Sequence, residues 1–341
     1  MRPTVQDVAR QAGVSLASVD RVLNQRPGVR EKTIAKVEAA ISKLGYIRDV
    51  SAANLAKRQI YRFVFVIPEG ANSFMRGLEA EIEAVKQHSA NDRTEISIYK
   101  VPPFDGRALA ATLDGLDPAR YSGVAVVATE AVAVRDALAR LRRNNVPVVT
   151  LVSDVPSFQC DAYVGIDNVA AGRTAARLMG NFLGEKSGKI ALVAGSMLVR
   201  DHVERRMGFE QVIRSDYTRL ECLPVIEGKD DGQLVQKYLS ECLRMHSDVV
   251  GVYNMGAGNR GLIEVLSKNG ASKERVVVAH ELTEHTRRAL NAGIVDAIIH
   301  QDAGHEVRSA LRILKARIDK TPLLAGQETI RIEIYLNENL S

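Results

Sequence analysis

The sequence lacks the long apolar runs, paired cysteines and leader pattern that would indicate a membrane or secreted protein. None of its hydrophobic stretches approaches the roughly 20 residues that a helix needs to span a bilayer. Its three cysteines, Cys160, Cys222 and Cys242, are scattered and odd in number, which argues against a disulfide framework or zinc site. No charged-then-apolar segment opens the chain. We therefore expect a cytoplasmic protein.

Patterns typical of catalysis are also missing. The sequence contains no nucleophile elbow, no phosphate-binding loop and no persuasive pair of acidic residues. His280 and His285 enclose two glutamates in a pattern that resembles a zinc motif, but the two histidines are five positions apart instead of four. They would not share a helix face as that motif requires. We therefore predict no enzymatic activity, no metal and no cofactor.

What the sequence does contain is an uneven distribution of charge. Its 341 residues are too many for one ordinary domain. Residues 1–62 contain 12 Lys/Arg and 5 Asp/Glu, whereas the remainder is slightly acidic. This asymmetry favours a nucleic-acid-binding module attached to a body with another role. A solvated basic face without a partner remains the alternative on charge alone.

The basic segment shows the spacing of three short helices. Thr4 begins a capping-box pattern, and apolar residues follow at helical spacing up to Gly13. Ser15 can cap a second helix that ends near Asn24, and a third helix ends at Gly45. Three short helices with a glycine in the first turn are typical of the helix-turn-helix arrangement.

The same segment resembles a known family. Residues 4–15 and 19–24 closely resemble the headpiece of the lactose/galactose repressor (LacI/GalR) family of transcriptional regulators, and residues 36–46 continue the match without a gap. One departure is Asp20, where the family usually has serine. A carboxylate there would repel phosphate unless Arg21 or another cation offsets it. It could also accept from a cytosine amino group, or pair with a neighbouring arginine.

The resemblance implies which side chains contact DNA. Leu16, Ala17 and Arg21 would reach base edges in the major groove, and polar neighbours would contact phosphates. A hinge at 48–60 would order when two copies meet over the operator, with Leu55 wedged into a minor-groove step. Leu55 could instead be an ordinary apolar residue of a linker helix. The predicted DNA-binding set is Thr4, Ser15, Leu16, Ala17, Ser18, Arg21, Asn24, Arg30, Asn54 and Leu55.

Beyond the hinge, short β-rich runs alternate with helical stretches. This alternation predicts parallel sheets covered by helices on both faces. Residues 164–168, 205–209 and 301–302 resemble elements of the periplasmic sugar-binding-protein fold used by the same family. We therefore predict an all-α helix-turn-helix headpiece (1–47), the hinge (48–60) and a two-lobed α/β periplasmic-binding-protein-like domain (61–341) with two parallel, doubly wound sheets. Lobe 1 is expected at about 61–162 and 295–325, and lobe 2 at about 163–294 and 326–341.

Polar residues that follow strands are the candidates for binding a small molecule, because ligands of such sheets bind beyond the carboxyl ends of the strands. Phe74 could stack on a sugar ring, and Arg205 could donate to hydroxyls or a carboxylate. Each candidate could instead be a loop cap or a contact between lobes. Residues 279–281 depart from the family's usual Gly-Phe-Asp, so sugar, polyol and sugar acid all stay open. The predicted effector-binding set is Asn72, Phe74, Glu130, Arg205, Asn254, Glu281 and Gln301.

A second interpretation comes from a glycine pattern. Gly256, Gly258 and Gly261 match G-x-G-x-x-G after an expected strand, and Glu281 lies about 20 residues further on, as in a dinucleotide site. This would make the protein an NAD(H)-sensing regulator or an NAD-dependent oxidoreductase. The position of the pattern in the second lobe and the repressor resemblance favour a regulator without NAD.

The resemblance also implies partners. A repressor of this family would bind a pseudo-palindromic double-stranded DNA operator as a homodimer and answer a small-molecule effector. Family members that form tetramers often carry an additional C-terminal leucine-rich helix. This chain ends soon after a strand expected at 329–335, so we expect a dimer.

Overall fold

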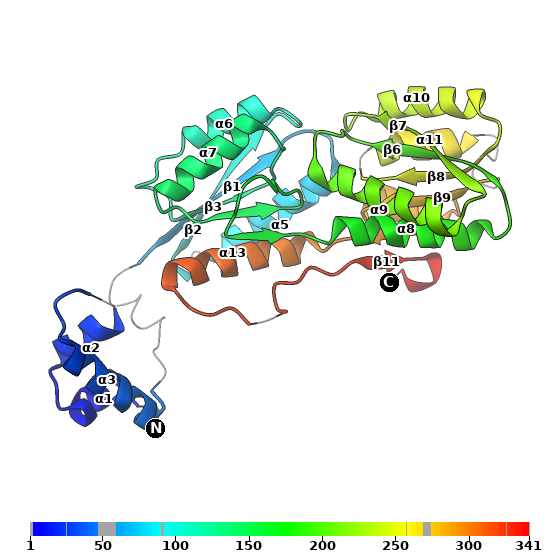
Figure 1. Ribbon diagram of the computed structural model, residues 1–341. Coiled ribbons are helices and arrows are strands. Elements are labelled where there is room, and N and C mark those ends of the chain that lie inside the picture. Colours follow the sequence, from blue (N-terminus) through cyan, green and yellow to red (C-terminus); the bar gives the residue numbers. More distant parts are fainter. Residues whose placement is uncertain are drawn as a thin grey trace. The chain divides into compact units, whose positions relative to one another are not determined.

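A computed structural model describes residues 3–24, 26–46, 59–89, 92–256, 258–268, 274–324 and 326–340. Contacts divide the chain into two compact units, residues 1–59 and 60–341 (Figure 1). Within the described residues, no helix is both long and apolar enough to cross a membrane.

The first unit is a small helical module. It contains α1 (Val5–Ala12), α2 (Leu16–Leu23) and α3 (Glu31–Leu44). Val8, Val19 and Val37, one from each helix, are fully buried and form the centre of its core. Gly13 has φ +64°, a left-handed conformation that glycine adopts without strain, and it turns the chain between α1 and α2. The helix-turn-helix prediction is confirmed.

The second unit contains two sheets. The first has the order β2-β1-β3-β4-β5, and all its strands are parallel. The interior of β1 is a continuous buried apolar run, as expected for a strand that helices cover on both faces. Its strands are β1 (Tyr61–Pro68), β2 (Thr94–Val101), β3 (Gly123–Val126), β4 (Val148–Leu151) and β5 (Ala162–Val164), and its helices are α5 (Ser73–Ser89), α6 (Gly106–Asp114), α7 (Val132–Arg143) and α13 (Ala303–Asp319).

The second sheet has the order β11-β10-β9-β8-β6-β7, and only β11 is antiparallel to its neighbour. Pro224 lies in β7, an edge strand, where a missing backbone donor is tolerated. Its strands are β6 (Gly188–Ala194), β7 (Leu220–Glu227), β8 (Val249–Asn254), β9 (Val276–His280), β10 (Ala297–His300) and β11 (Glu333–Tyr335), and its helices are α8 (Asn168–Leu183), α9 (Arg200–Asp216), α10 (Gly232–Met245), α11 (Asn259–Leu266) and α12 (Glu284–Asn291).

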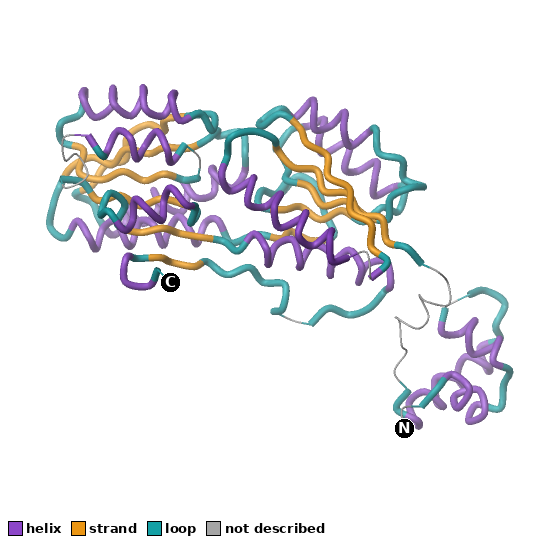
Figure 2. Tube along the Cα trace, turned by 180° about the vertical axis from the view of Figure 1, so that it is seen from behind, coloured by secondary structure: helices purple, strands orange, loops and turns teal. Residues whose placement is uncertain are grey.

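Helices cover both faces of each sheet, as the view from behind also shows (Figure 2). Alternate residues of β1 explain how this works. Phe63 and Phe65 pack in one core with α5 and α13, whereas Val64 and Val66 pack in a separate core with α6 and α7. The prediction of two doubly wound, largely parallel sheets is confirmed.

Two strands lie in a different sheet from the one expected. β10 belongs to the second sheet, although residues 295–325 were expected in lobe 1, and the chain returns to the first sheet only with α13. β5 completes the first sheet, although lobe 2 was expected from residue 163. Strands of both sheets are similar apolar runs, so hydrophobic patterning does not reveal which sheet a strand joins. The strand expected at 329–335 is shorter, at Glu333–Tyr335.

Candidate DNA-binding face and ligand cleft

The first two helices are held by caps at their N-termini. Thr4 and Asp7 form a reciprocal capping box on α1, with the Thr4 N–H donating to Asp7 Oδ2 at 2.9 Å. These bonds hold the pKa of Asp7 below its usual value. Ser15 Oγ accepts from the Ser18 N–H at the start of α2. Ser15 thus has a structural role as a cap.

Asp20, the departure from the family pattern, has local partners. Its Oδ1 accepts from Asn24 Nδ2 at 2.7 Å, and its Oδ2 lies 3.4 Å from Arg26 Nη1. The cation that offsets this carboxylate is therefore Arg26, not Arg21. Of the alternatives from sequence, pairing with a neighbouring arginine describes the geometry best. Arg21 is exposed beside it, and nothing in the described chain forms an ion pair with it.

The other predicted DNA-binding residues mostly share the exposed surface of this unit. Leu16 is half exposed, which is unusual for a leucine in such a small domain. Thr4, Ser15, Ala17, Arg21 and Arg30 are exposed, and Ser18 and Asn24 are partly so. The start of α2 therefore presents a mixed apolar and polar face to solvent. Asn54 and Leu55 lie outside the described residues.

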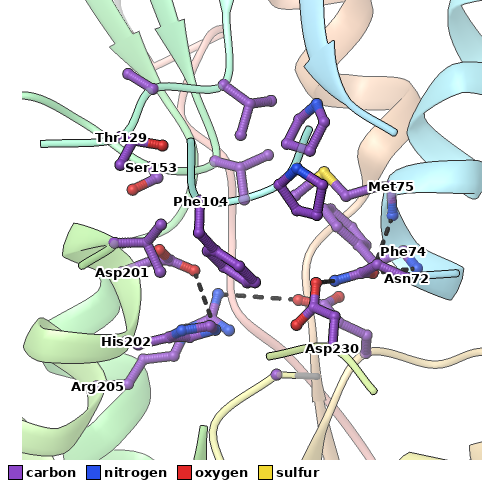
Figure 3. Close-up of a pocket in the computed structure, with 18 of the residues that line it drawn as sticks. Asn72, Phe74, Met75, Phe104, Thr129, Ser153, Asp201, His202, Arg205 and Asp230 are labelled. Carbon is purple, nitrogen blue, oxygen red and sulfur yellow. Dashed lines mark hydrogen bonds and ion pairs between the residues drawn. The ribbon is translucent and has the colours of Figure 1, made fainter. Parts of the chain in front are cut away.

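A cleft lies at the carboxyl ends of both sheets (Figure 3). Loops that follow β1, β2, β3, β4, β7, β9 and β10 contribute to it, together with the first turns of α9. The space among its lining atoms, mouth included, is about 610 Å³. Five of the seven residues predicted from sequence line it: Asn72, Phe74, Arg205, Glu281 and Gln301.

Arg205 is the most deeply buried cation of the cleft, with 2% of its surface exposed. Its Nε donates to Asn168 Oδ1 at 2.8 Å and its Nη1 to the Met255 carbonyl at 2.7 Å. Gly208, one turn further along α9, lets that helix approach α8, because a Cβ there would lie 2.0 Å from the Val169 carbonyl oxygen. The remaining nitrogen, Nη2, lies 3.8 Å from Glu281 Oε1.

Glu281 and Gln301 follow the neighbouring strands β9 and β10 and contact each other. Gln301 Nε2 donates to Glu281 Oε1 at 2.8 Å. Glu281 Oε2 lies 3.3 Å from His300 Nδ1, and the Leu282 N–H lies 3.2 Å from the same nitrogen. Both Glu281 and Gln301 are almost completely buried.

Asn72 and Asp230 join the two lobes across the cleft. Asn72 Oδ1 caps α5 by accepting from the Phe74 and Met75 N–H groups. Its Nδ2 donates to Asp230 Oδ2 at 2.8 Å, a bond drawn in Figure 3. Burial raises the pKa of Asp230. A second contact between lobes runs from the Arg200 N–H to Ser153 Oγ at 3.2 Å.

The structure does not bring Glu130 and Asn254 into the lining of the cleft. Glu130 follows β3 as expected but is exposed to solvent. Asn254 is buried and serves its own loop, where its Nδ2 donates to Asn259 Oδ1 and its Oδ1 accepts from the Gly256 N–H. His280 is also absent from the lining. It packs against Tyr253, and burial lowers its pKa well below the ordinary value, so this imidazole is neutral.

Two features distinguish the cleft from an ordinary packed interior. Four buried polar atoms of its lining have no hydrogen-bond partner among the described residues: Arg205 Nη2, Asp230 Oδ1, Glu281 Oε2 and Gln301 Oε1. Buried polar atoms are normally paired, so each calls for an explanation. Four of the eight described non-glycine residues with positive φ also line it: Phe104, Val152, Asp230 and Glu281. Such strained backbone is concentrated at functional sites.

Sequence reasoning missed several lining residues. Asp201 and His202 lie one turn before Arg205 on α9, so helical spacing from Arg205 was a usable signal. Phe104 and Asp230 lie in the loops that follow β2 and β7. Thr129 and Ser153 follow β3 and β4, and their position after a strand was the only sequence signal that could have identified them.

Packing accounts for the glycines of the G-x-G-x-x-G pattern. A Cβ on Gly261 would lie 2.0 Å from the Gly232 carbonyl oxygen, where α11 approaches α10. Gly258 has φ +79°, and a Cβ there would lie 2.4 Å from Val235. A Cβ on Gly256 would lie 2.9 Å from His202 Nε2. These contacts remove the motif as an argument for a dinucleotide. Across the described ranges, no cluster of His, Cys, Asp or Glu has the arrangement of a metal site.

Comparison with known proteins identifies two domains. Residues 4–49 match the model of the bacterial regulatory proteins of the lacI family. Residues 63–322 match a periplasmic binding protein domain. Solved structures agree with the second match, since a glucose-galactose binding protein from Geobacillus stearothermophilus covers 83% of this chain and 99% of its own, with a TM-score of 0.74 and 19% identity. A solute-binding protein from Burkholderia graminis in complex with D-arabinose has a TM-score of 0.73 and 19% identity and covers 82% of this chain and 96% of its own.

Two curated relatives each match more than half of this chain. Catabolite control protein A of Priestia megaterium is 26% identical over 277 residues, which are 77% of this chain and 79% of that protein. The transcriptional regulator DegA of Bacillus subtilis is 26% identical over 226 residues, 62% of this chain and 61% of DegA. The match thus spans less than two thirds of DegA. With the helix-turn-helix unit, the two-sheet body and both domain matches in one chain, the protein belongs to the LacI family of transcriptional regulators.

Proposed function

We propose that the protein binds a pseudo-palindromic operator as a homodimer in the cytoplasm, and that a small hydroxyl-rich effector in the cleft controls this binding. The observation that carries the proposal is the set of four unpartnered buried polar atoms described above. Leaving such groups unpaired costs about 1–3 kcal/mol each. A ligand that pairs with them would recover that free energy on binding.

Hydroxyl groups match this set because they both donate and accept. Arg205 Nη2 offers a donor, whereas the free oxygens of Asp230, Glu281 and Gln301 are acceptors. Phe74 supplies an aromatic surface for the apolar face of a ring. Sugar-binding proteins of the same fold, such as the arabinose and glucose-galactose binders above, support this ligand class.

Control of DNA binding would follow from the contacts between lobes. The Asn72–Asp230 and Ser153–Arg200 bonds hold one lobe arrangement, and a ligand shifts the balance of arrangements by its differential affinity. The body joins the headpiece through the hinge expected at 48–60, so a change of lobe angle would alter hinge spacing in a dimer. The wedge role of Leu55 stays a prediction.

The test uses full-length protein and two measurements. Operator sequences are first selected from random DNA, and their symmetry reports whether two headpieces bind together. Sugars, polyols and sugar acids are then screened by thermal shift and by their effect on operator affinity. We expect at least one compound to raise the melting temperature and change operator affinity. A ligand that binds tightly in the cleft without changing operator affinity would contradict the proposed control.

A further inference from the structure

The charges that line the cleft do not balance. Three carboxyl groups, those of Asp201, Asp230 and Glu281, face one guanidinium, that of Arg205. Even if His202 is counted as protonated, the carboxyl groups remain in excess. Asp201, Arg205 and Glu281 are each less than 8% exposed, so solvent screens their charges poorly.

The single guanidinium is largely committed to other partners. Two of its nitrogens donate to Asn168 and to the Met255 carbonyl, and the third lies nearest to Glu281. No lysine or arginine of the described chain lies within ion-pair distance of Asp230 or Asp201. The nearest cationic candidate is His202, whose Nε2 lies 3.7 Å from Asp201 Oδ2. Asp230 is therefore a largely desolvated carboxyl without a cationic partner.

Asp230 is nevertheless aimed at the cleft, not at solvent. Its Oδ2 is fixed by Asn72, and its Oδ1 is buried without a partner. A Cβ placed on Gly195 would lie 2.5 Å from Asp230 Oδ1, 3.0 Å from His202 Cε1 and 3.2 Å from Phe104 Cζ, so the oxygen, the imidazole and the edge of the phenyl ring all lie against Gly195. Phe104 adopts φ +61° and its ring projects into the centre of the cleft (Figure 3). Burial also raises the pKa of Asp230, and the hydrogen bond from Asn72 and the nearby His202 oppose this rise.

A largely buried carboxylate beside an aromatic ring is a favourable site for an ammonium group. The carboxylate supplies the opposite charge, and the face of a phenyl ring attracts cations through its quadrupole. We infer that the effector carries a protonated amine in addition to hydroxyl groups, and that the amine binds between Asp230 and Phe104. This inference rests on the proposed function and narrows it, because it excludes the sugar acids that the sequence left open. A ligand carboxylate or phosphate would add negative charge to a cleft that already has too much.

The experiment compares ligands that differ only in one charged group. Full-length protein is titrated calorimetrically with hexosamines, their parent hexoses and the matching hexuronic acids, and with 1-amino-1-deoxysorbitol beside sorbitol. We expect at least one amine to bind about tenfold or more tightly than its hydroxyl parent. A desolvated cation–π contact with Phe104, together with the ion pair to Asp230, supplies at least that factor. The hexuronic acids should bind most weakly.

Asp230→Asn provides the decisive variant, because it keeps the shape and the Asn72 contact but removes the charge. It should abolish the preference for the amine, so that an amine and its parent sugar bind this variant with affinities within about threefold of each other, whatever the variant does to the affinity for both. Asp231→Asn is the matched control, because Asp231 caps α10 and asparagine also caps helices well. It should leave the preference intact.

Three outcomes would overturn the inference. A parent sugar or acid that binds as tightly as its amine would do so and leave the proposed function standing. An amine preference that survives in Asp230→Asn would place the amine elsewhere and so contradict the assigned site. If no compound of the panel binds at millimolar concentration while operator binding is intact, both the amine and the hydroxyl-rich effector class fail for these ligands.

Discussion

The headpiece and the cleft differ in the exposure of their candidate binding residues and in the sequence distance between them. The predicted DNA-binding residues that the structure describes are exposed or partly exposed, lie within residues 4–30, and include several held by bonds between residues three or four positions apart. The cleft residues are buried, come from both lobes and are held by bonds such as Asn72–Asp230, which spans 158 positions. An exposed surface on a basic module suits a long polyanion, whereas an enclosed set of unpaired groups suits a small molecule.

The comparison also shows where free energy is stored. In the headpiece the caps satisfy the polar groups at the start of α1 and α2, so little strain remains. In the cleft, left-handed residues such as Phe104 and Glu281 and unpaired buried atoms persist because the surrounding sheets enforce them. The two regions should therefore respond very differently to mutation and to pH.

The largest effect should follow from separating the two regions. Deleting residues 1–60 should lower operator affinity by at least about 1000-fold, to undetectable levels, because the body alone is slightly acidic. The remaining residues, 61–341, keep the core of the second unit and should melt cooperatively and keep any ligand-induced shift. Electrophoretic mobility and thermal shift measure the two properties. Operator binding by the truncated chain would contradict the division of roles.

A smaller effect is expected from a substitution that weakens effector binding by the body and leaves operator binding by the headpiece intact. Arg205→Ala leaves buried partners of the guanidinium unpaired, at about 1–3 kcal/mol each, and should weaken effector binding by about 10- to 150-fold. Operator binding should survive. Arg206→Ala is the control, because Arg206 is partly exposed on the next position of α9 and pairs with Glu210. Wild-type effector affinity of Arg205→Ala in calorimetry would show that the cleft is not the binding site.

The same contrast determines what the sequence could predict. The headpiece follows from contiguous patterns, Thr4 to Asp7 and Ser15 to Asn24, because local caps decide its helices. Asn72, Arg205 and Gln301 were found because they follow strands or fit a family element. Asp230 was not predicted from the sequence. Its place in the cleft depends on its hydrogen bond with Asn72 and its contact with Gly195, both of which join residues far apart in the chain. Asn254 shared the position after a strand, but its side chain turns toward Asn259. The direction in which a side chain points after a strand is determined by tertiary packing, not by the local sequence pattern.

Dependence on pH should be a property of the body, through Glu306 of α13. Glu306 is completely buried, and burial, followed by Glu281, raises its pKa well above the ordinary value; Asp302 and Asp201 act in the same direction and Arg205 opposes them. Because the folded pKa exceeds the unfolded one, this group's stabilising contribution is complete below the unfolded pKa and is lost as pH rises toward the folded pKa. Glu306→Gln cannot ionise and should escape that loss.

We therefore expect the melting temperature of Glu306→Gln to exceed that of the wild type by a few degrees at about pH 8.5, and the difference to shrink toward about pH 5. Taking the difference between the two proteins cancels contributions of other groups, such as the neutral His280. Glu83→Gln on α5, where Glu83 is partly exposed and pairs with Lys86, is the control and should show no trend with pH. A difference that is constant across this pH range would mean that Glu306 is ionised in the folded protein.

The smallest effect tests the headpiece alone, at Asp20. Its partners Asn24 and Arg26 are local and its side chain is about half exposed, so Asp20→Asn should change stability by less than about 1 kcal/mol. Removing the carboxylate also frees Arg26 and takes a negative charge from the face of α2, so operator affinity should rise a few-fold at low salt. If Arg26 then pairs with a DNA phosphate, the slope of log affinity against log salt concentration should steepen by about the amount that one phosphate contact contributes. Glu38→Gln is the control, because it makes the same change of net charge at an exposed position of α3. It distinguishes the effect of the position of the charge from the effect of the total charge. Equal gains for both variants in anisotropy titrations would mean that Asp20 acts only through net charge, whereas a loss of affinity confined to operators with one particular base would mean that its carboxylate reads that base directly.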